Sequence, residues 1–159
     1  MVAALESESV WDYPRPPALV ADPRAVQVVF AGETVAYTNR AYRVLETSHP
    51  PSFYIPPEDV RFDLVVGTPK RSFCEWKGAA QYWTIKVGRQ MAENAAWSYS
   101  NPTSRFAAIK DYVSFYPCRM HKCLVGDEEV QSQEGGFYGG WITSEIKGPF
   151  KGGPDTWGW

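Results

Sequence analysis

The amino-acid sequence predicts a mainly β fold: a compact domain of small antiparallel sheets, with one or two short helices and an extended C-terminal strap. Two features of the composition lead to this prediction. Of the 159 residues 15% are aromatic, and the chain contains 13 glycines and 13 prolines. Aromatic side chains favour the pleated surface of a sheet, whereas glycine and proline favour turns. A chain of this length is typical of one domain.

The N-terminal residues 1–25 are expected to form an extended arm, and residues 26–159 are expected to form the single domain. The arm has few periodic apolar positions, but it carries Trp11, Tyr13 and several prolines. Because the burial of aromatic side chains away from water is favourable, we expect the arm to pack on the body of the domain.

Three strands are expected next, at residues 26–30, 34–37 and 42–47. The first is an apolar, β-branched run, and the turn at 31–33 joins it to the second as a hairpin. Proline pairs at 50–51 and 56–57 exclude a long helix or a central strand in the segment that follows. Pro57 with its acidic neighbours predicts a short helix over 57–61 instead.

The second half of the chain alternates short strands with turns. Strands are expected at residues 64–66, 70–74, 79–87, 95–100, 113–116, 119–125 and 129–131. Apolar residues at i and i+3 predict two helical turns over 104–110. The tail from 134 to 159 contains eight of the thirteen glycines and three of the seven tryptophans. It is expected to wrap the body as a strap, since glycine lets backbone approach closely.

Charge and hydropathy exclude several classes of partner. The net charge is −2, and lysine and arginine are scattered along the chain, which provides no electrostatic footprint for nucleic acid or an anionic membrane. No apolar run approaches the roughly 18 residues that span a bilayer. The acidic N-terminal sequence MVAALESESV lacks the basic and apolar regions of a signal peptide, so a cytoplasmic location is expected.

The cysteines are Cys74, Cys118 and Cys123, and their odd number argues against a disulfide framework. The motif CRMHKC places His121 between two of them, which is one pattern of a metal site. In a strand over 119–125, however, His121 and Cys123 would share one face and Cys118 would point away. Two ligands fall short of the four of structural zinc, so no metal and no cofactor are expected.

The middle of the chain is the strongest candidate for a functional site, because it mixes aromatic and ionisable residues. Cys74 would be a nucleophile or redox thiol if Lys77 or His49 stabilised its thiolate; alternatively, it is a small buried hydrophobe. Lys77 precedes a glycine in a tight turn. Its ammonium would pair either with an anionic ligand or with Glu46 or Glu75.

Glu46, Ser48 and His49 stand in the motif LETSHPP, where two prolines restrict the backbone. Histidine titrates near neutral pH, so His49 would be the acid or base of an enzyme; alternatively, it caps the proline-rich loop. The candidate ligand-binding aromatic residues are Tyr54, Tyr82, Trp97 and Tyr99. They would form a cage that attracts cations or stacks on planar rings, or they would fill the core.

One set of motifs extends over most of the chain: CEWKGAAQYW, AAWSYSNP and FYP, flanked by VWDYPRPP, RVLETSHPPSFYIPPEDV and GGFYGGWITSEIKGPFKGGP. From about Val10 to the C-terminus, the sequence resembles the family called domain of unknown function 427, which is sometimes labelled nucleotidyltransferase-like. The last motif resembles a longer variant known mostly from cyanobacteria and other photosynthetic bacteria. The resemblance implies a β-tent-like domain.

The nucleotidyltransferase label finds no support in the residues. Nucleotidyl transfer needs paired acids that hold magnesium and a loop that binds phosphate. The chain contains neither GxGxxG nor GxxxxGK[ST], and the acidic run at 127–129 suits a solvated hairpin turn.

Three functions remain. The first is a binding module that holds a small planar or charged metabolite in an aromatic pocket near Lys77, since such pockets with a few polar groups are the usual form of small-molecule sites. The second is an enzyme with Cys74 as nucleophile or redox thiol and His49 or Glu46 as proton carrier. The third is a structural interaction domain, whose aromatic tail meets a partner or a second copy in a homodimer.

Overall fold

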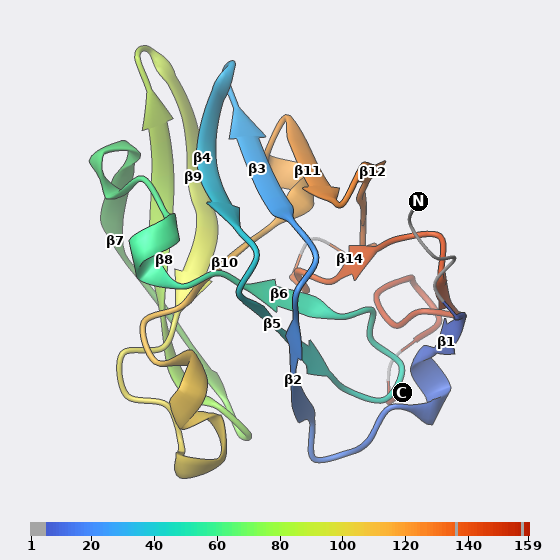
Figure 1. Ribbon diagram of the computed structural model, residues 1–159. Helices are drawn as coiled ribbons and strands as arrows, with labels where there is room; N and C mark the ends of the chain where they lie inside the picture. The colour runs from blue at the N-terminus through green and yellow to red at the C-terminus, as the bar shows by residue number, and fades with distance from the viewer. Residues whose placement is uncertain (1–5, 136, 157) are drawn as a thin grey trace.

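The computed structural model describes residues 6–135, 137–156 and 158–159 (Figure 1). Within these residues the strands form five small sheets, and the helical segments are short 3-10 turns. The prediction of a mainly β fold is confirmed. In the described part of the chain, none of the helical segments has the length and apolar composition of a membrane span.

Two antiparallel sheets have four strands each. The first has the order β10-β9-β8-β7 and consists of β7 (Val65–Cys74), β8 (Gly78–Val87), β9 (Gln90–Ser98) and β10 (Val113–Phe115). The second has the order β12-β11-β3-β4 and consists of β3 (Val26–Phe30), β4 (Glu33–Thr38), β11 (Lys122–Val125) and β12 (Glu128–Glu129).

Three smaller units complete the strands. A sheet of order β2-β5-β6 consists of β2 (Ala18–Asp22), β5 (Ala41–Leu45) and β6 (Ser52–Tyr54). The antiparallel pair is β13 (Gln131–Ser132) with β14 (Trp141–Ile142), and the parallel pair is β1 (Glu8–Ser9) with β15 (Ile146–Lys147). The 3-10 turns are η1 (Val10–Asp12), η2 (Pro57–Asp59), η3 (Phe62–Leu64), η4 (Ser104–Ile109) and η5 (Pro117–Arg119).

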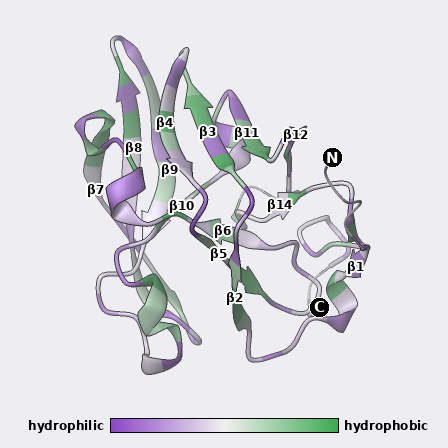
Figure 2. Cartoon of the chain, viewed as in Figure 1, coloured by the Kyte–Doolittle hydropathy of each residue, from purple (hydrophilic) through white to green (hydrophobic). Residues whose placement is uncertain are grey.

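The main core lies between the two four-stranded sheets. On β3, Val26, Val28 and Phe30 are buried and alternate with less buried residues, the pattern of a strand with one face against a core. Ile85 of β8 and Phe115 of β10 belong to the same core. Figure 2 shows the corresponding hydrophobic segments on strands of both sheets.

A second cluster, mostly aromatic, lies where the first sheet meets the three-stranded sheet. We call it the aromatic cluster; its buried members are Val44, Tyr54, Ala80, Tyr82, Trp97, Tyr99, Phe106, Ile109 and Tyr116. The aromatic rings come from β6, β8, β9, the residue that follows β9, η4 and the residue that follows β10. The aromatic cluster therefore joins elements that are distant in the sequence.

An ionic cluster ties the N-terminal segment and the C-terminal tail to the three-stranded sheet. Its members are Glu8, Asp22, Arg24, Arg43 and Glu145. Arg24 lies 2.7 Å from a carboxylate oxygen of both Asp22 and Glu145, and Arg43 lies 2.9 Å from Glu8. Burial opposes ionisation of Asp22, but hydrogen bonds from Arg24 outweigh it and lower the pKa of Asp22.

The C-terminal tail belongs to the core. Trp141 is fully buried, and its Nε1 donates a hydrogen bond of 3.0 Å to the carbonyl of Phe115. A Cβ atom at Gly139 would overlap the ring of Trp97, so glycine is required where the tail crosses the aromatic cluster. The prediction of an extended strap is confirmed.

Several strand boundaries differ from the sequence prediction, for example that of β9, which begins at Gln90 and not at residue 95; β7 and β2 differ most. β7 is one strand and not two, because the segment predicted as a turn at 67–69 is a register shift within it. Since β7 is an edge strand, Pro69 can stand there without removing a ladder hydrogen bond. β2 pairs with β5 along its whole length, so the last part of the predicted arm is a sheet strand.

Two further predictions concern helices and the CRMHKC motif. The predicted helices at 57–61 and 104–110 are the 3-10 turns η2 and η4. The predicted strand 119–125 begins only at Lys122, because Pro117 starts η5, which continues to Arg119.

Candidate functional site

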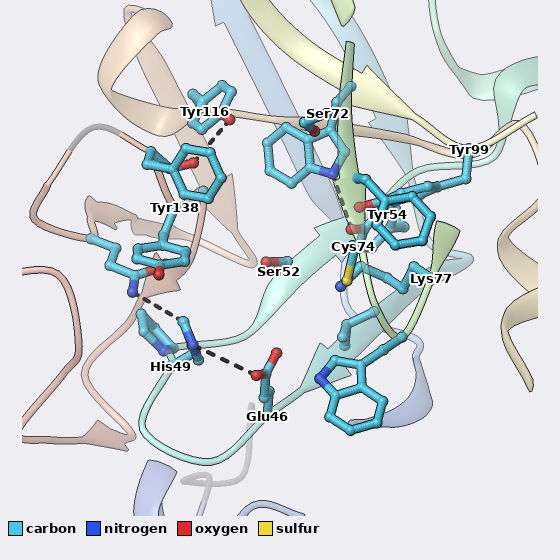
Figure 3. Close-up of a pocket in the computed structure, with 18 of the residues that line it drawn as sticks. Glu46, His49, Ser52, Tyr54, Ser72, Cys74, Lys77, Tyr99, Tyr116 and Tyr138 are labelled. Atoms are coloured by element: carbon cyan, nitrogen blue, oxygen red, sulfur yellow. Dashed lines mark hydrogen bonds and ion pairs between the residues drawn. The ribbon is translucent and has the colours of Figure 1, made fainter. Parts of the chain in front are cut away.

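A pocket of about 460 Å³ opens beside the aromatic cluster (Figure 3). All eight residues that the sequence predicts for a ligand site line it: Glu46, His49, Tyr54, Cys74, Lys77, Tyr82, Trp97 and Tyr99. Figure 3 shows His49 and Tyr138 on one side, with Tyr54, Tyr99, Cys74 and Lys77 on the other. Their convergence is a property of the structure, and their role in binding stays a prediction.

The wall on the sheet side is set by strand register. Tyr82 of β8 stands opposite Trp97 of β9, so both side chains emerge on one face of the sheet. Trp97 packs against Tyr116 with ring centroids 4.6 Å apart and meets Tyr54 edge-on at 6.1 Å. The resulting wall presents aromatic faces and edges to the pocket.

Polar contacts hold these rings in place. The Nε1 of Trp97 donates a hydrogen bond of 3.1 Å to the Tyr54 hydroxyl, and the hydroxyls of Ser72 and Tyr82 lie 2.8 Å apart. The Tyr116 hydroxyl donates to the carbonyl of Phe137 at 3.0 Å. Burial raises the pKa of the Tyr54 hydroxyl above its ordinary value, so this hydroxyl is neutral at neutral pH.

His49 is held by Gln133 on the opposite wall. The Gln133 side-chain oxygen accepts from the backbone N–H of Gly140 at 3.1 Å, and its Nε2 lies 3.3 Å from Nδ1 of His49. An amide nitrogen can only donate, so Nδ1 of neutral His49 is the acceptor and Nε2 carries the proton. That proton faces Glu46, whose carboxylate lies 3.8 Å from Nε2.

The charge of His49 depends on its burial and on nearby cations. Burial lowers the pKa of His49 to about 4, with further lowering by Lys151, Arg15 and Lys77. The imidazole is therefore neutral at neutral pH, and its contact with Glu46 is not an ion pair. The contact between His49 and Gln133 is consistent with the alternative role of His49, in which it ties down the proline-rich loop. His49 also lines the pocket, so both roles stay open.

Lys77 is the buried cation of the pocket. Its side chain follows β7 in the turn before Gly78 and is only 9% exposed. Among the residues that the structure describes, its Nζ makes no hydrogen bond and no ion pair; neither Glu46 nor Glu75 is its partner. Its nearest aromatic faces are those of Tyr99 and Phe106, with each ring centroid 5.9 Å from Nζ.

The three cysteines have different environments. Cys74 is partly buried and lines the pocket, Cys118 is exposed, and Cys123 is buried. His121 accepts a hydrogen bond of 2.7 Å from the backbone N–H of Ala31 through Nδ1 and stacks on Phe30. In the described residues no three His, Cys, Asp or Glu side chains form a group that could hold a metal ion.

The sequence prediction missed the wall that the C-terminal tail supplies. That wall contains Gln133, Phe137, Tyr138, Gly139 and Lys151. The signal was present in the paired glycines of GGFYGG, because glycine next to aromatic residues permits backbone to approach a ring face. Ser52, Ser72 and Tyr116 also line the pocket and had no distinctive sequence pattern.

The family comparison covers only part of this site. A family model described as Domain of unknown function (DUF427) matches residues 18–126, which is more than half of the chain. All eight predicted site residues lie within the match, whereas the wall from the tail lies beyond it. No curated protein matches the chain. The chain belongs to the family Domain of unknown function (DUF427).

Proposed function

We propose that this protein is a binding module for a small metabolite with a planar portion. The observation that supports this function best is the pocket of about 460 Å³, a volume within the range of small-molecule sites. Its sheet-side wall consists of aromatic rings fixed by hydrogen bonds and by mutual packing. Stacking on such a wall would stabilise a bound planar ligand.

Fixed rings favour binding because little conformational entropy is lost when a ligand enters. Trp97 cannot rotate freely, since its Nε1 is bonded to Tyr54 and Gly139 of the tail lies against its ring. The opposite wall carries the neutral imidazole of His49, which is held by Gln133. Both walls are thus preorganised, which reduces the cost of association.

A thermal-shift screen with a metabolite library tests the proposal. The melting temperature of the wild-type protein is expected to rise in the presence of library compounds that contain an aromatic or heteroaromatic ring, because a ligand that binds the native state stabilises it. Ser52→Phe, which places a ring in the pocket, should remove the gain. Ser132→Phe is the matched control, because Ser132 is an exposed strand serine outside the pocket.

Tryptophan fluorescence gives a second readout, since Trp97 lines the pocket. A library that shifts neither the melting temperature nor the fluorescence would contradict the proposal. A gain that persists unchanged in Ser52→Phe would also contradict it, because the ligand would then bind elsewhere.

A further inference from the structure

Lys77 carries the pocket charge that has no partner in the described structure. The residue is more than nine-tenths buried, lines the pocket and makes neither a hydrogen bond nor an ion pair with any described residue. The faces of Tyr99 and Phe106 at 5.9 Å offer only the weak attraction of a cation for a ring. Its Nζ is not among the fully buried polar atoms that lack a partner, so the ammonium faces the pocket, where an anionic group could reach it.

The other charged groups of the pocket are already accounted for. Lys151 donates from Nζ to the backbone carbonyl of Trp159 at 3.3 Å. Glu46 lies 3.8 Å from Nε of Arg15, and Glu75 is exposed to solvent. The carboxylates that line the pocket therefore leave the ammonium of Lys77 unmatched.

His49 responds to the same excess of positive charge. Burial is the largest cause of its lowered pKa, and Lys151, Arg15 and Lys77 each lower the pKa further. Three cations thus act on the imidazole in the same direction as burial. The interior of the pocket is thus electrostatically suited to a negative group.

Building on the proposed function, we propose that the ligand is a planar organic acid whose carboxylate pairs with the Lys77 ammonium. A carboxylate carries one charge and matches one lysine. A phosphate monoester carries nearly two charges and usually needs an arginine fork or several backbone N–H groups, and no arginine lines this pocket. The ring of the acid would stack on the aromatic wall, while neutral hydroxyls such as that of Ser72 face its edge.

Matched ligands separate this inference from the proposed function. The probes are benzoate, indole-3-acetate and naphthalene-2-carboxylate, each compared with its own primary amide, and 2-naphthyl phosphate as the phosphate arm. Calorimetry on the wild-type protein should show that an acid binds about tenfold more tightly than its amide, since a hydrogen bond to a charged group is worth that factor.

Lys77→Met should abolish the preference for the acid and leave the affinity for the amide within about twofold. Lys86→Met, an exposed lysine on β8, is the control and should keep the preference. If acid and amide bind equally to the wild-type protein, or if the phosphate binds best, this inference is wrong and the binding module stands. If none of the probes binds, the inference and the proposed function both lose support.

Discussion

Two sites with a largely buried cation in this protein have opposite surroundings. In the ionic cluster, the guanidinium of Arg24 lies 2.7 Å from both Asp22 and Glu145, and that of Arg43 lies 2.9 Å from Glu8. In the pocket, the Lys77 ammonium lies among rings without an acidic partner in the described residues. Arg43 and Lys77 are each 9% exposed, so the presence or absence of an acidic partner does not follow from the exposure of the residue.

The difference indicates what each group does. Arginines whose carboxylate partners are present hold segments together, and here they join the N-terminal segment, the tail and the three-stranded sheet. A lysine without an acidic partner gives no such link. We therefore interpret the ionic cluster as structural and the Lys77 pocket as a place for an external anion.

Removing an arginine from the ionic cluster should have the largest effect on stability. Arg43→Met leaves Glu8 without its guanidinium; because Glu8 is 33% exposed, the cost should be about 1–3 kcal/mol, between that of a surface pair and that of a buried pair. Urea denaturation should show a correspondingly lower free energy of unfolding. Arg61→Met is the control, because Arg61 pairs with Asp63 and Glu33 on the surface, where such pairs contribute little. A result in which both variants are equally stable would contradict the structural role.

Acid should destabilise the protein partly through His49. Its pKa is lowered to about 4 in the folded protein and is about 6.5 when unfolded, so the unfolded state binds the proton first. This stabilisation is complete above pH 6.5 and is lost as the pH falls towards 4, by roughly 3 kcal/mol at pH 4. Denaturation between pH 7 and 4 should show a steeper decline in the wild-type protein than in His49→Gln.

The ionic cluster should respond to acid in a different window. The pKa values of Glu8, Asp22 and Glu145 are lowered in spite of burial, because hydrogen bonds favour the ionised forms: from Arg43 for Glu8, from Arg24 for Asp22, and from Thr143 and Arg24 for Glu145. Their stabilisation is lost only below their ordinary pKa values near 4. If His49→Gln shows the same decline as the wild-type protein between pH 7 and 4, the assignment of that window to His49 is wrong.

Loosening the aromatic wall should have a smaller effect. Tyr54→Phe removes the hydroxyl that accepts the hydrogen bond from Trp97 and leaves a buried N–H without a partner. The free energy of unfolding should fall by about 1–2 kcal/mol, and ligand affinity should fall with it if a fixed ring is required. Tyr37→Phe is the control, because Tyr37 is an exposed tyrosine on β4. An unchanged stability in Tyr54→Phe would show that water replaces the hydroxyl.

Cysteine substitution should have the smallest effect on stability and decides the enzyme hypothesis. Cys74→Ser should change the free energy of unfolding by less than about 1 kcal/mol, since Cys74 lies at the pocket surface. Iodoacetamide should label Cys74 and the exposed Cys118 in the native protein. It should not label Cys123, whose burial raises the pKa of its thiol.

A nucleophilic role requires more than accessibility. Cys74 would have to react faster than a free thiol below pH 8, and a pocket ligand should protect Cys74 while leaving Cys118 reactive. Labelling of Cys74 at or below the rate of Cys118, measured by mass spectrometry, would exclude an activated thiolate. The binding module would then be the better description.

More of the fold than of the candidate site could be predicted from the sequence. The alternation of apolar residues on β3 and the turn after it are signals within a few residues of each other in the sequence. The hairpin of β3 and β4 could therefore be predicted. The division of the chain at Gly67 to Pro69 was predicted wrongly, because pairing with β8 continues across the register shift. For the site, the aromatic and ionisable residues of the middle third were identified, and the wall from the tail was not.

By itself, the sequence determined the strand-rich architecture, the family and the chemical character of the candidate residues, because composition and short-range periodicity encode them. Only the tertiary structure decided that Gln133 fixes the proton of His49 on Nε2 and that Lys77 has neither Glu46 nor Glu75 as a partner. These contacts depend on chain segments that meet across the pocket. Charge pairing is a matter of distances of a few ångströms in space, and a sequence pattern does not contain those distances.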